Sequence, residues 1–239
     1  MSGDRSRRLR LGGFPLLSTR SAPLIAHLAR RLRRGRQTVL LFANTNFFVQ
    51  CAPLLPQLRE PGVRLVNDGI GLSIAARLMK RHRFPENLNG TDFLPGLLTQ
   101  LQAPVFLLGG RPGIAERAAA TLARTHGVAV VGSRNGYGGL ADTAAVVAAI
   151  TDSGAEVVVV ALGNPLQERW ILTHRARLGP RLLIGAGALL DFLAGEVPRA
   201  PGWVRSLRLE WLFRLAQEPR RLLRRYTLDI LTFLRLCRE

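Results

Sequence analysis

Five apolar segments of the chain are each followed by residues whose side chains or backbone could do chemistry. These residues are Asn44-Thr45-Asn46, Asn67-Asp68-Gly69, Gly109-Gly110-Arg111, Asn135-Gly136-Tyr137 and Gly163 to Glu168. Amides, carboxylates and free backbone N–H groups bind hydroxyls and phosphates, and carboxylates also move protons. If the apolar segments are parallel strands, their ends converge on one crevice, which is where such sheets bind ligands.

Asp68 is the residue best suited to acid–base chemistry. A carboxylate that follows a buried strand and precedes Gly-x-Gly is partly removed from water, which raises its pKa toward the range of a general base. The alternative is that Asp68 only caps a helix that begins near Gly71, and Asn67 has the same two interpretations.

The segment Gly109 to Gly113 joins an expected strand to an expected helix. Its glycines allow close backbone approach, and free N–H groups at the start of a helix bind phosphate. The segment matches neither Gly-x-Gly-x-x-Gly nor the Walker loop, which argues against a nicotinamide or nucleoside-triphosphate site. A purely structural turn is the alternative.

Metal binding has little support in the sequence. The four histidines are scattered, and no Asp-x-Asp occurs. We therefore expect no metal and no other cofactor. A bound diphosphate would then have to be neutralised by arginines and helix ends.

Apolar, β-rich segments alternate with helical patterns along the middle of the chain. The expected strands are Thr38–Ala43, Val63–Asn67, Val105–Gly109, Val128–Gly132, Val157–Gly163 and Leu182–Gly185. Helices are expected at about 71–83, 112–126, 138–152 and 164–177, and Thr91 or Asp92 is a candidate helix cap. Near-continuous runs of Val, Leu and Ile indicate strands that are covered on both faces. The pattern predicts a single α/β domain with a mostly parallel sheet.

Composition and charge narrow the classes of partner. The 239-residue chain has 47% hydrophobic and 21% charged residues, as in a globular protein with a large core. Of its net charge of +18, residues 1–36 carry +9, residues 199–239 carry +6, and the middle carries +3. Basic ends on a nearly neutral body suit an anionic membrane surface, phosphate ligands or nucleic acid.

No signal peptide or membrane-spanning run is recognisable in the sequence. The two cysteines, Cys51 and Cys237, show no metal or redox spacing. We therefore expect a cytosolic, reducing location.

The last forty residues combine arginines with an apolar face. After Pro219, one helical face carries Leu222, Tyr226, Ile230, Phe233 and Cys237, and the first turns carry several arginines. This pattern favours a helix that lies on a lipid surface. The alternative is a terminal helix that packs on the domain and leaves its arginines in water.

Taken together, the motifs resemble the WecG/TagA/CpsF family of glycosyltransferases. They are Asn67-Asp68-Gly69-Ile70-Gly71, Asn89-Gly90-Thr91-Asp92, Leu108-Gly109-Gly110, Gly163-Asn164-Pro165-Leu166-Gln167-Glu168, Gly185-Ala186-Gly187-Ala188 and the tail from Arg199-Ala200-Pro201 to Arg225-Tyr226. The resemblance extends from about Leu11 to the end of the chain. We expect a catalytic domain at 1–198, with 1–10 disordered, and a basic helical membrane-associating appendage at 199–239.

The resemblance implies a Rossmann-like fold and an inverting, metal-independent transfer of a sugar. The donor would be a UDP-sugar of the N-acetylmannosamine, N-acetylmannosaminuronic acid or glucose type. The acceptor would be a saccharide linked to undecaprenyl diphosphate, at the cytoplasmic face of the plasma membrane. The product would enter a cell-surface polysaccharide.

The resemblance also assigns roles to residues. It places the base on Asp68 and its partner Thr-x-Asn motif on Asn44-Thr45-Asn46, where either Asn44 or Thr45 stands for the family threonine. Gln167 and Glu168 match a Gln-Glu pair of the pocket. The expected catalytic residues are Asp68 and Thr45, and the expected substrate-binding residues are Asn44, Asn46, Asn67, Gly69, Asn89, Thr91, Asp92, Gly109, Gly110, Arg111, Tyr137, Asn164, Gln167, Glu168, Arg214, Arg221 and Arg224.

Two other classes of function remain as alternatives. A nucleotide-binding oxidoreductase would use Gly109–Gly113 for pyrophosphate, but the dinucleotide fingerprint is missing. A nucleic-acid binder would use the basic ends, but no nucleic-acid-binding motif is recognisable, so we expect no nucleic-acid partner. The tail arginines have two open roles, with UDP or with anionic lipid. The oligomeric state is also open, with a homo-oligomer among the alternatives.

Overall fold

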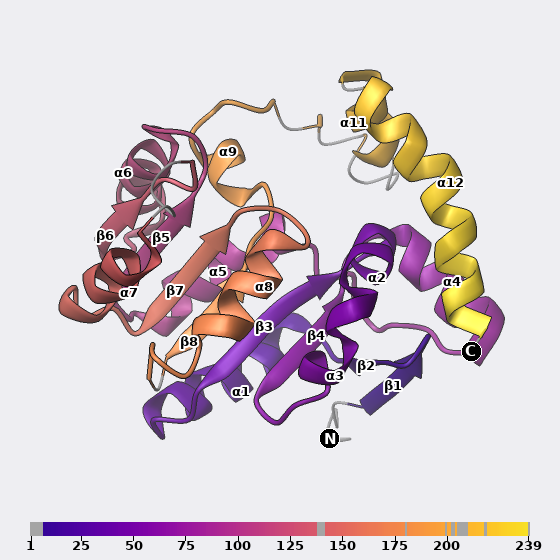
Figure 1. Cartoon of the computed structure of the whole chain (residues 1–239), viewed down its shortest axis with the longest axis horizontal. Helices are drawn as coiled ribbons and strands as arrows, with labels where there is room; N and C mark the ends of the chain where they lie inside the picture. The colour runs from indigo at the N-terminus through magenta and orange to yellow at the C-terminus, as the bar shows by residue number, and fades with distance from the viewer. Residues whose placement is uncertain are drawn as a thin grey trace.

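The computed structural model describes residues 7–137, 142–179, 181–198, 200–201, 204, 210–217 and 219–238. Within these residues the chain forms an eight-stranded sheet with helices on both faces (Figure 1). The strands are β1 (Arg7–Leu11), β2 (Phe14–Ser18), β3 (Thr38–Ala43), β4 (Val63–Asn67), β5 (Val105–Gly109), β6 (Val130–Arg134), β7 (Val157–Ala161) and β8 (Leu182–Gly185). They lie in the order β1-β2-β4-β3-β8-β7-β5-β6, and every neighbouring pair is parallel except β1 with β2.

The helices divide between the two faces of the sheet. One face is covered by α2 (Thr45–Cys51), η1 (Ala52–Leu54), α3 (Leu55–Leu58), α4 (Ile70–Lys80), α7 (Thr143–Asp152), α8 (Leu166–His174) and α12 (Pro219–Arg238). The other is covered by α1 (Ser21–Arg33), α5 (Gly90–Leu101), α6 (Ile114–His126) and α9 (Leu189–Leu193). The remaining helix, α11 (Glu210–Gln217), contacts α12. This is the predicted Rossmann-like α/β architecture.

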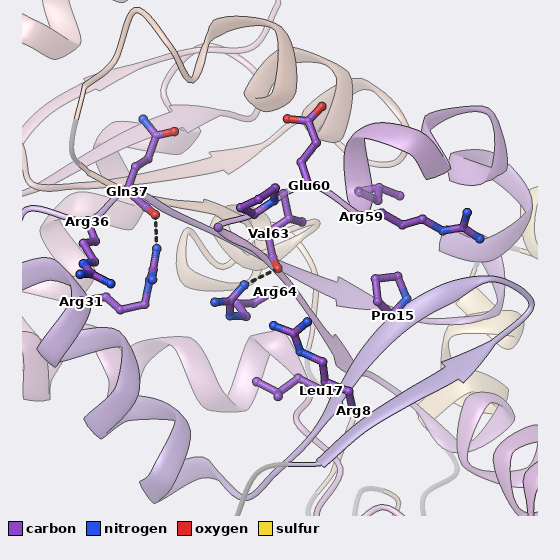
Figure 2. A pocket seen from close by; sticks show the side chains of 13 residues that line it. Arg8, Pro15, Leu17, Arg31, Arg36, Gln37, Arg59, Glu60, Val63 and Arg64 are labelled. Atoms are coloured by element: carbon purple, nitrogen blue, oxygen red, sulfur yellow. Dashed lines mark hydrogen bonds between the residues drawn. The ribbon is translucent and has the colours of Figure 1, made fainter.

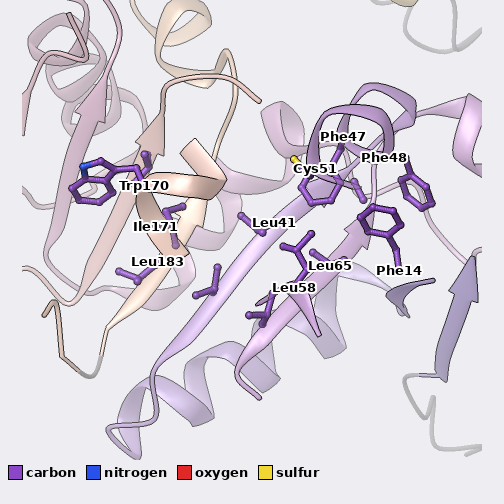
Figure 3. Packing of buried hydrophobic residues seen from close by; sticks show 14 of the residues in the cluster. Phe14, Leu41, Phe47, Phe48, Cys51, Leu58, Leu65, Trp170, Ile171 and Leu183 are labelled. Carbon is purple, nitrogen blue, oxygen red and sulfur yellow. The ribbon is translucent and has the colours of Figure 1, made fainter. Parts of the chain in front are cut away.

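The central strands form because their side chains are apolar on both faces. Every residue of β3, β5 and β7 is buried, as expected for parallel strands between two layers of helices. On one face, Phe14, Phe47 and Phe48 gather beside Cys51 (Figure 3). The rings of Phe14 and Phe48 lie 4.2 Å apart between centroids.

The predicted strands agree closely with the structure at the centre of the sheet and less well elsewhere. β3, β4, β5 and β8 have the predicted bounds. β7 ends two residues before the predicted Gly163, whose φ of 76° departs from an extended strand. β6 lies two residues later than predicted, and its ladder with β5 shifts register between Val105 and Phe106.

The amino-terminal hairpin corrects the prediction of disorder at residues 1–10 for residues 7–10, while residues 1–6 lie outside the described part of the chain. Residues 7–10 belong to β1, which pairs with β2 through the turn at Gly12 and Gly13. Both glycines have positive φ, 50° and 75°, as a two-residue type I′ hairpin requires. Leu11 and Phe14 are fully buried and fix the hairpin to the core.

The carboxyl half of α12 packs on the α/β domain, beside α2 and α4 (Figure 1). Phe233 and Cys237 are 2% and 1% exposed, and the Phe233 ring meets Phe48 edge-on at 5.3 Å. A side chain at Gly12 would reach within 2.7 Å of the Leu236 carbonyl oxygen. The apolar face predicted for lipid is therefore used, in this half of the helix, for packing on the protein.

A helix that crosses a bilayer needs about 20 consecutive, mostly apolar residues. None of the helices in the described part of the chain has both the length and the apolarity that crossing a bilayer requires.

We predict that Phe233→Ala lowers the free energy of unfolding by about 3–5 kcal/mol, because it leaves a cavity beside Phe48. Urea unfolding measures the change. Leu231→Ala, at a position 58% exposed on the same helix, is the matched control and should change stability little. Equal effects of the two substitutions would contradict the packing of α12.

Candidate active site

The carboxyl ends of β3 and β4 meet at one edge of the sheet and bring Thr45 next to the Asp68 loop. The Asp68 N–H donates to the Ala43 carbonyl at 2.8 Å. A Cβ built on Gly71 would lie 2.7 Å from Thr45 Cγ2, so glycine at position 71 lets the threonine approach the loop backbone. Thr45 and Asp68 are both half-buried. Thr45, the first residue of α2, thus lies next to the turn that carries Asp68.

Asp68 stands immediately before the helix-cap position of α4. That position is Gly69, which has φ 90° and makes no side-chain cap hydrogen bond. The Gly69 N–H donates instead to Asn87 Oδ1 at 2.7 Å. Because an L-residue is strained at this φ, glycine is needed here. Asn87, which the sequence analysis did not select, is the residue that anchors the turn carrying Asp68.

Asn67 is fully buried and ties β4 to the connection that leads to α5. Its side-chain amide donates to the Glu86 carbonyl at 2.9 Å, and its own carbonyl accepts from the Leu88 N–H at 3.1 Å. Its Oδ1 has no hydrogen-bond partner among the described residues. Asn67 has no exposed surface, and from behind the strand end it holds the connection to α5 in position, while its contact with substrate stays a prediction.

Asn44 and Asn89 are helix caps. Asn44 Oδ1 accepts from the Phe47 N–H at 3.0 Å and caps α2. Asn89 Oδ1 accepts from the Thr91 N–H at 2.9 Å and caps α5, so the cap predicted at Thr91 or Asp92 lies two or three residues earlier. Capping satisfies a backbone N–H that the helix itself leaves free.

The other predicted residues of these two helices lie in their first turns. Thr45 and Asn46 begin α2 and are half-buried. Thr91 is half-buried and Asp92 is exposed in the first turn of α5. The helix starts therefore present these side chains at the strand-end edge.

Close backbone contacts join the ends of β5 and β7. The Gly110 N–H donates to the Ala161 carbonyl at 3.3 Å, and the Gly136 N–H donates to the Gly110 carbonyl at 2.8 Å. A Cβ on Gly109 would lie 2.2 Å from the Ala161 oxygen, so no side chain fits there. After these strands α6 and α8 leave toward opposite faces of the sheet. Such divergence opens a crevice between neighbouring strand ends.

Arg111 and Tyr137 lie in the segments that follow β5 and β6. Arg111 is exposed, as are Pro112 and Gly113, and α6 begins at Ile114 rather than at the predicted position 112. Tyr137 is 66% exposed. Both side chains are thus accessible to a ligand at the strand ends.

A chain of hydrogen bonds links the ends of β7 and β8 through Glu168. Glu168 Oε1 accepts from Asn164 Nδ2 at 2.6 Å and from Gln167 Nε2 at 2.8 Å. Gln167 Oε1 accepts from the Gly187 N–H at 3.0 Å. Gln167 is 4% exposed and Glu168 is 0% exposed. These two predicted substrate-binding residues lie behind the surface and orient the half-buried Asn164 and the Gly187 turn.

Burial gives Glu168 an unusual protonation behaviour. Removal from water raises its pKa from 4.5 to about 6, although the hydrogen bonds from Gln167 and Asn164 oppose the shift. Its Oε2 has no conventional hydrogen-bond partner in the part of the chain that the structure describes. The neighbouring Cys51 thiol has its pKa raised by burial and then by the charge of Glu168.

The predicted tail contacts cannot be placed beside these groups. The backbones of Arg214, Arg221 and Arg224 belong to α11 and α12. Their side chains lie outside the described part of the structure.

Fold and site together define a Rossmann-like α/β protein with polar groups gathered at the carboxyl edge of its parallel strands. The chain belongs to the glycosyl transferase WecG/TagA/CpsF family, which it matches over residues 9–239. It is therefore a glycosyltransferase of the kind that makes cell-surface polysaccharides, and the resemblance seen in the motifs is confirmed. Membership in a transferase family argues against the oxidoreductase alternative.

We predict that Glu168→Gln makes stability less dependent on pH. The folded state keeps the Glu168 proton up to about pH 6, whereas the unfolded chain releases it near pH 4.5. The folded state binds more protons in this window, so wild-type stability falls as pH rises through it and stays lower above it. Glutamine retains the accepting Oε1, and the variant should exceed the wild type at pH 7.5 by up to about 2 kcal/mol.

Urea unfolding between pH 4 and pH 8 tests this prediction. The two proteins should be about equally stable at pH 4. Glu156→Gln, at an exposed carboxylate, is the matched control and should follow the wild-type profile. A Glu168→Gln profile that runs parallel to the wild type at all pH values would show that Glu168 does not titrate in this window.

Proposed function

We propose that this protein transfers a sugar from a UDP-sugar to a saccharide linked to undecaprenyl diphosphate, with inversion and without a metal. The observation that carries the proposal is the position of Asp68, half-buried at the end of β4 and beside Thr45 at the end of β3. The family supports a sugar donor and a lipid-linked acceptor in general terms. The nature of the nucleotide, the lipid and the mechanism are part of the proposal.

In the proposed reaction Asp68 is the general base. Its carboxylate takes the proton from an acceptor hydroxyl while that oxygen attacks the anomeric carbon of the donor. The bond from the anomeric carbon to the UDP oxygen breaks, and UDP leaves with the electron pair. A single displacement of this kind inverts the configuration at the anomeric carbon.

Thr45 is the proposed partner of Asp68. The Asn44 side chain accepts the Phe47 N–H as the cap of α2, which favours Thr45 as the counterpart of the family threonine. The Thr45 methyl contacts the loop at Gly71, two positions after Gly69. Its hydroxyl is proposed to orient the acceptor or to hold the Asp68 turn in register.

Negative charge on the departing UDP would be met at the β5 and β7 ends. The amino end of α6, thirteen residues long, offers backbone N–H groups and the positive end of the helix dipole. The exposed Arg111 lies in the same turn. Arg214, Arg221 and Arg224 are proposed as further contributors, and the basic tail is proposed to bring the enzyme to the inner face of the membrane.

We predict that Asp68→Asn lowers turnover by roughly a hundredfold or more, because an amide cannot accept the acceptor proton. Folding and UDP binding should be nearly unchanged, since the two side chains have the same shape. The measurement is transfer from a UDP-sugar to a lipid-linked acceptor, with UDP binding followed by calorimetry. Asp152→Asn, at an exposed carboxylate in α7, is the matched control, and turnover of Asp68→Asn near that of the control would contradict the role of base.

We also predict that turnover persists in excess EDTA, because the diphosphate would be neutralised by arginines and N–H groups. The assay uses UDP-N-acetylmannosamine, UDP-N-acetylmannosaminuronic acid and UDP-glucose in parallel, so that it also identifies the donor. Activity that is lost with EDTA and restored by Mg²⁺ or Mn²⁺ would contradict metal-independent transfer.

A further inference from the structure

A second anion-attracting region lies far from the strand ends just described. A pocket of about 560 Å³ opens at the amino end of β4, between the β1–β2 hairpin, the end of α1 and the turn after α3. This volume is within the range of small-molecule sites, about 300–1,000 Å³. Arg64, in this pocket, and Asp68 are four residues apart, or about 13 Å along β4. The pocket is therefore separate from the candidate active site.

Arginines dominate the lining of this pocket. Arg8 comes from β1, Arg31 from α1, Arg36 from the following turn, Arg59 from the end of α3 and Arg64 from β4. In Figure 2 the side chains of Arg8, Arg31, Arg36 and Arg64 gather on one side, and Arg59 points away toward the hairpin. Four cations, from β1, α1, the turn after α1 and β4, thus gather on one side of the hollow.

Among the residues that the structure describes, no ion pair compensates the positive charge of the pocket. The one carboxylate in the lining, Glu60, forms an ion pair with Arg175, which lies outside the lining. None of the five lining arginines forms an ion pair with any other residue that the structure describes. An anion from outside could therefore interact with the four arginines that gather on one side.

Neighbouring arginines also repel one another across the pocket. Burial lowers the pKa of Arg64, and the charges of Arg31 and Arg8 lower it further. Burial and the charge of Arg36 lower the pKa of Arg31. The same field reaches His27, whose pKa is lowered by burial and then by Arg64 and Arg31. A bound anion would relieve this repulsion.

Two of these guanidinium groups are held in place before any ligand arrives. Arg31 Nε donates to Thr38 Oγ1 at 2.6 Å and its Nη2 to the Gln37 carbonyl at 2.7 Å. Arg64 Nη1 donates to the Val63 carbonyl at 2.8 Å. A guanidinium has five N–H donors, so each group keeps donors for a ligand. Arg8 and Arg36 are exposed and form the rim.

We propose that this pocket binds a phosphate-bearing anion. A phosphate or diphosphate carries several negative charges and several acceptor oxygens, and it matches the fork of an arginine side chain. A single carboxylate would neutralise only one of the converging cations. Two sources supply the same chemistry: a soluble phosphorylated compound, or the headgroup of an anionic phospholipid at a membrane.

The test uses the full-length protein and the rim variant Arg8→Gln/Arg36→Gln. Both side chains are exposed and donate no hydrogen bond to any residue that the structure describes, so folding should be preserved, which circular dichroism would check. Calorimetry with inorganic pyrophosphate at low salt should show binding that weakens about tenfold or more in the rim variant. Arg77→Gln/Arg124→Gln, exposed on α4 and α6, removes the same charge and should bind like the wild type.

A second arm identifies the source of the phosphate. Sedimentation with phosphatidylglycerol vesicles, compared with phosphatidylcholine vesicles, should be weakened by the rim variant if the ligand is a lipid headgroup. Vesicle binding that equals the wild type, with pyrophosphate binding reduced, identifies a soluble ligand. In both cases the effect should shrink as salt is raised.

Arg111→Gln separates the pocket from the strand-end site, where pyrophosphate could also bind. Pyrophosphate binding at the arginine-lined pocket should be unchanged by this substitution. Pyrophosphate binding that is lost in Arg111→Gln and kept in the rim variant would overturn the proposal. The proposal would also be overturned if the wild-type protein bound neither pyrophosphate nor anionic vesicles. The same holds if the rim variant bound pyrophosphate and vesicles as well as Arg77→Gln/Arg124→Gln does.

Discussion

The parallel pairing of β3 with β4 is the constraint on which the candidate active site depends. The ladder runs in register from Val39 opposite Val63 to Ala43 opposite Asn67, so both strands end at the same level. Asp68, the residue after β4, donates its N–H to the Ala43 carbonyl, and the Thr45 methyl fills the space over Gly71. A larger side chain at position 71 would displace the threonine. Glycine at that position therefore lets the first turns of α2 and α4 approach each other, although they lie more than twenty residues apart in the sequence.

The central strands were predictable because a strand that is buried on both faces has a nearly continuous apolar sequence. The hairpin β1–β2 was not predicted, because arginines alternate with Leu9 and Leu11 in β1 and only Leu11 is fully buried. The Gly12-Gly13 pair was the available signal. The face of α12 could not be assigned, since an apolar stripe looks the same whether lipid or protein covers it. The contact between Phe48 and Phe233 shows that the protein covers this face in the carboxyl half of α12.

Positions at the strand ends were predictable, but what the side chains do there was not. Asp68 and Thr45 follow strands, and parallel pairing alone brings them together. Glu168 carries a carboxylate that could bind a ligand. In the structure this carboxylate points inward and accepts hydrogen bonds from Asn164 and Gln167. The direction in which the Glu168 side chain points depends on how the ends of β7 and β8 pack, and a local sequence pattern does not predict such packing. Asn87 was not predicted as a site residue because its hydrogen-bond partner, Gly69, lies eighteen residues earlier in the sequence.

The fold also changes what the net charge means. By segment, the charge divides into basic ends and a nearly neutral middle. In space, Arg8 and Arg36 from the amino-terminal segment meet Arg64 from the middle at the amino end of β4. About 13 Å of strand separates this cluster from Asp68, and the Debye length at physiological ionic strength is about 8 Å. Exposed arginines at that distance contribute little field at the strand ends. A diphosphate leaving there would have to be neutralised by groups of its own neighbourhood, the start of α6 and Arg111, together with whatever cations the tail brings to that edge.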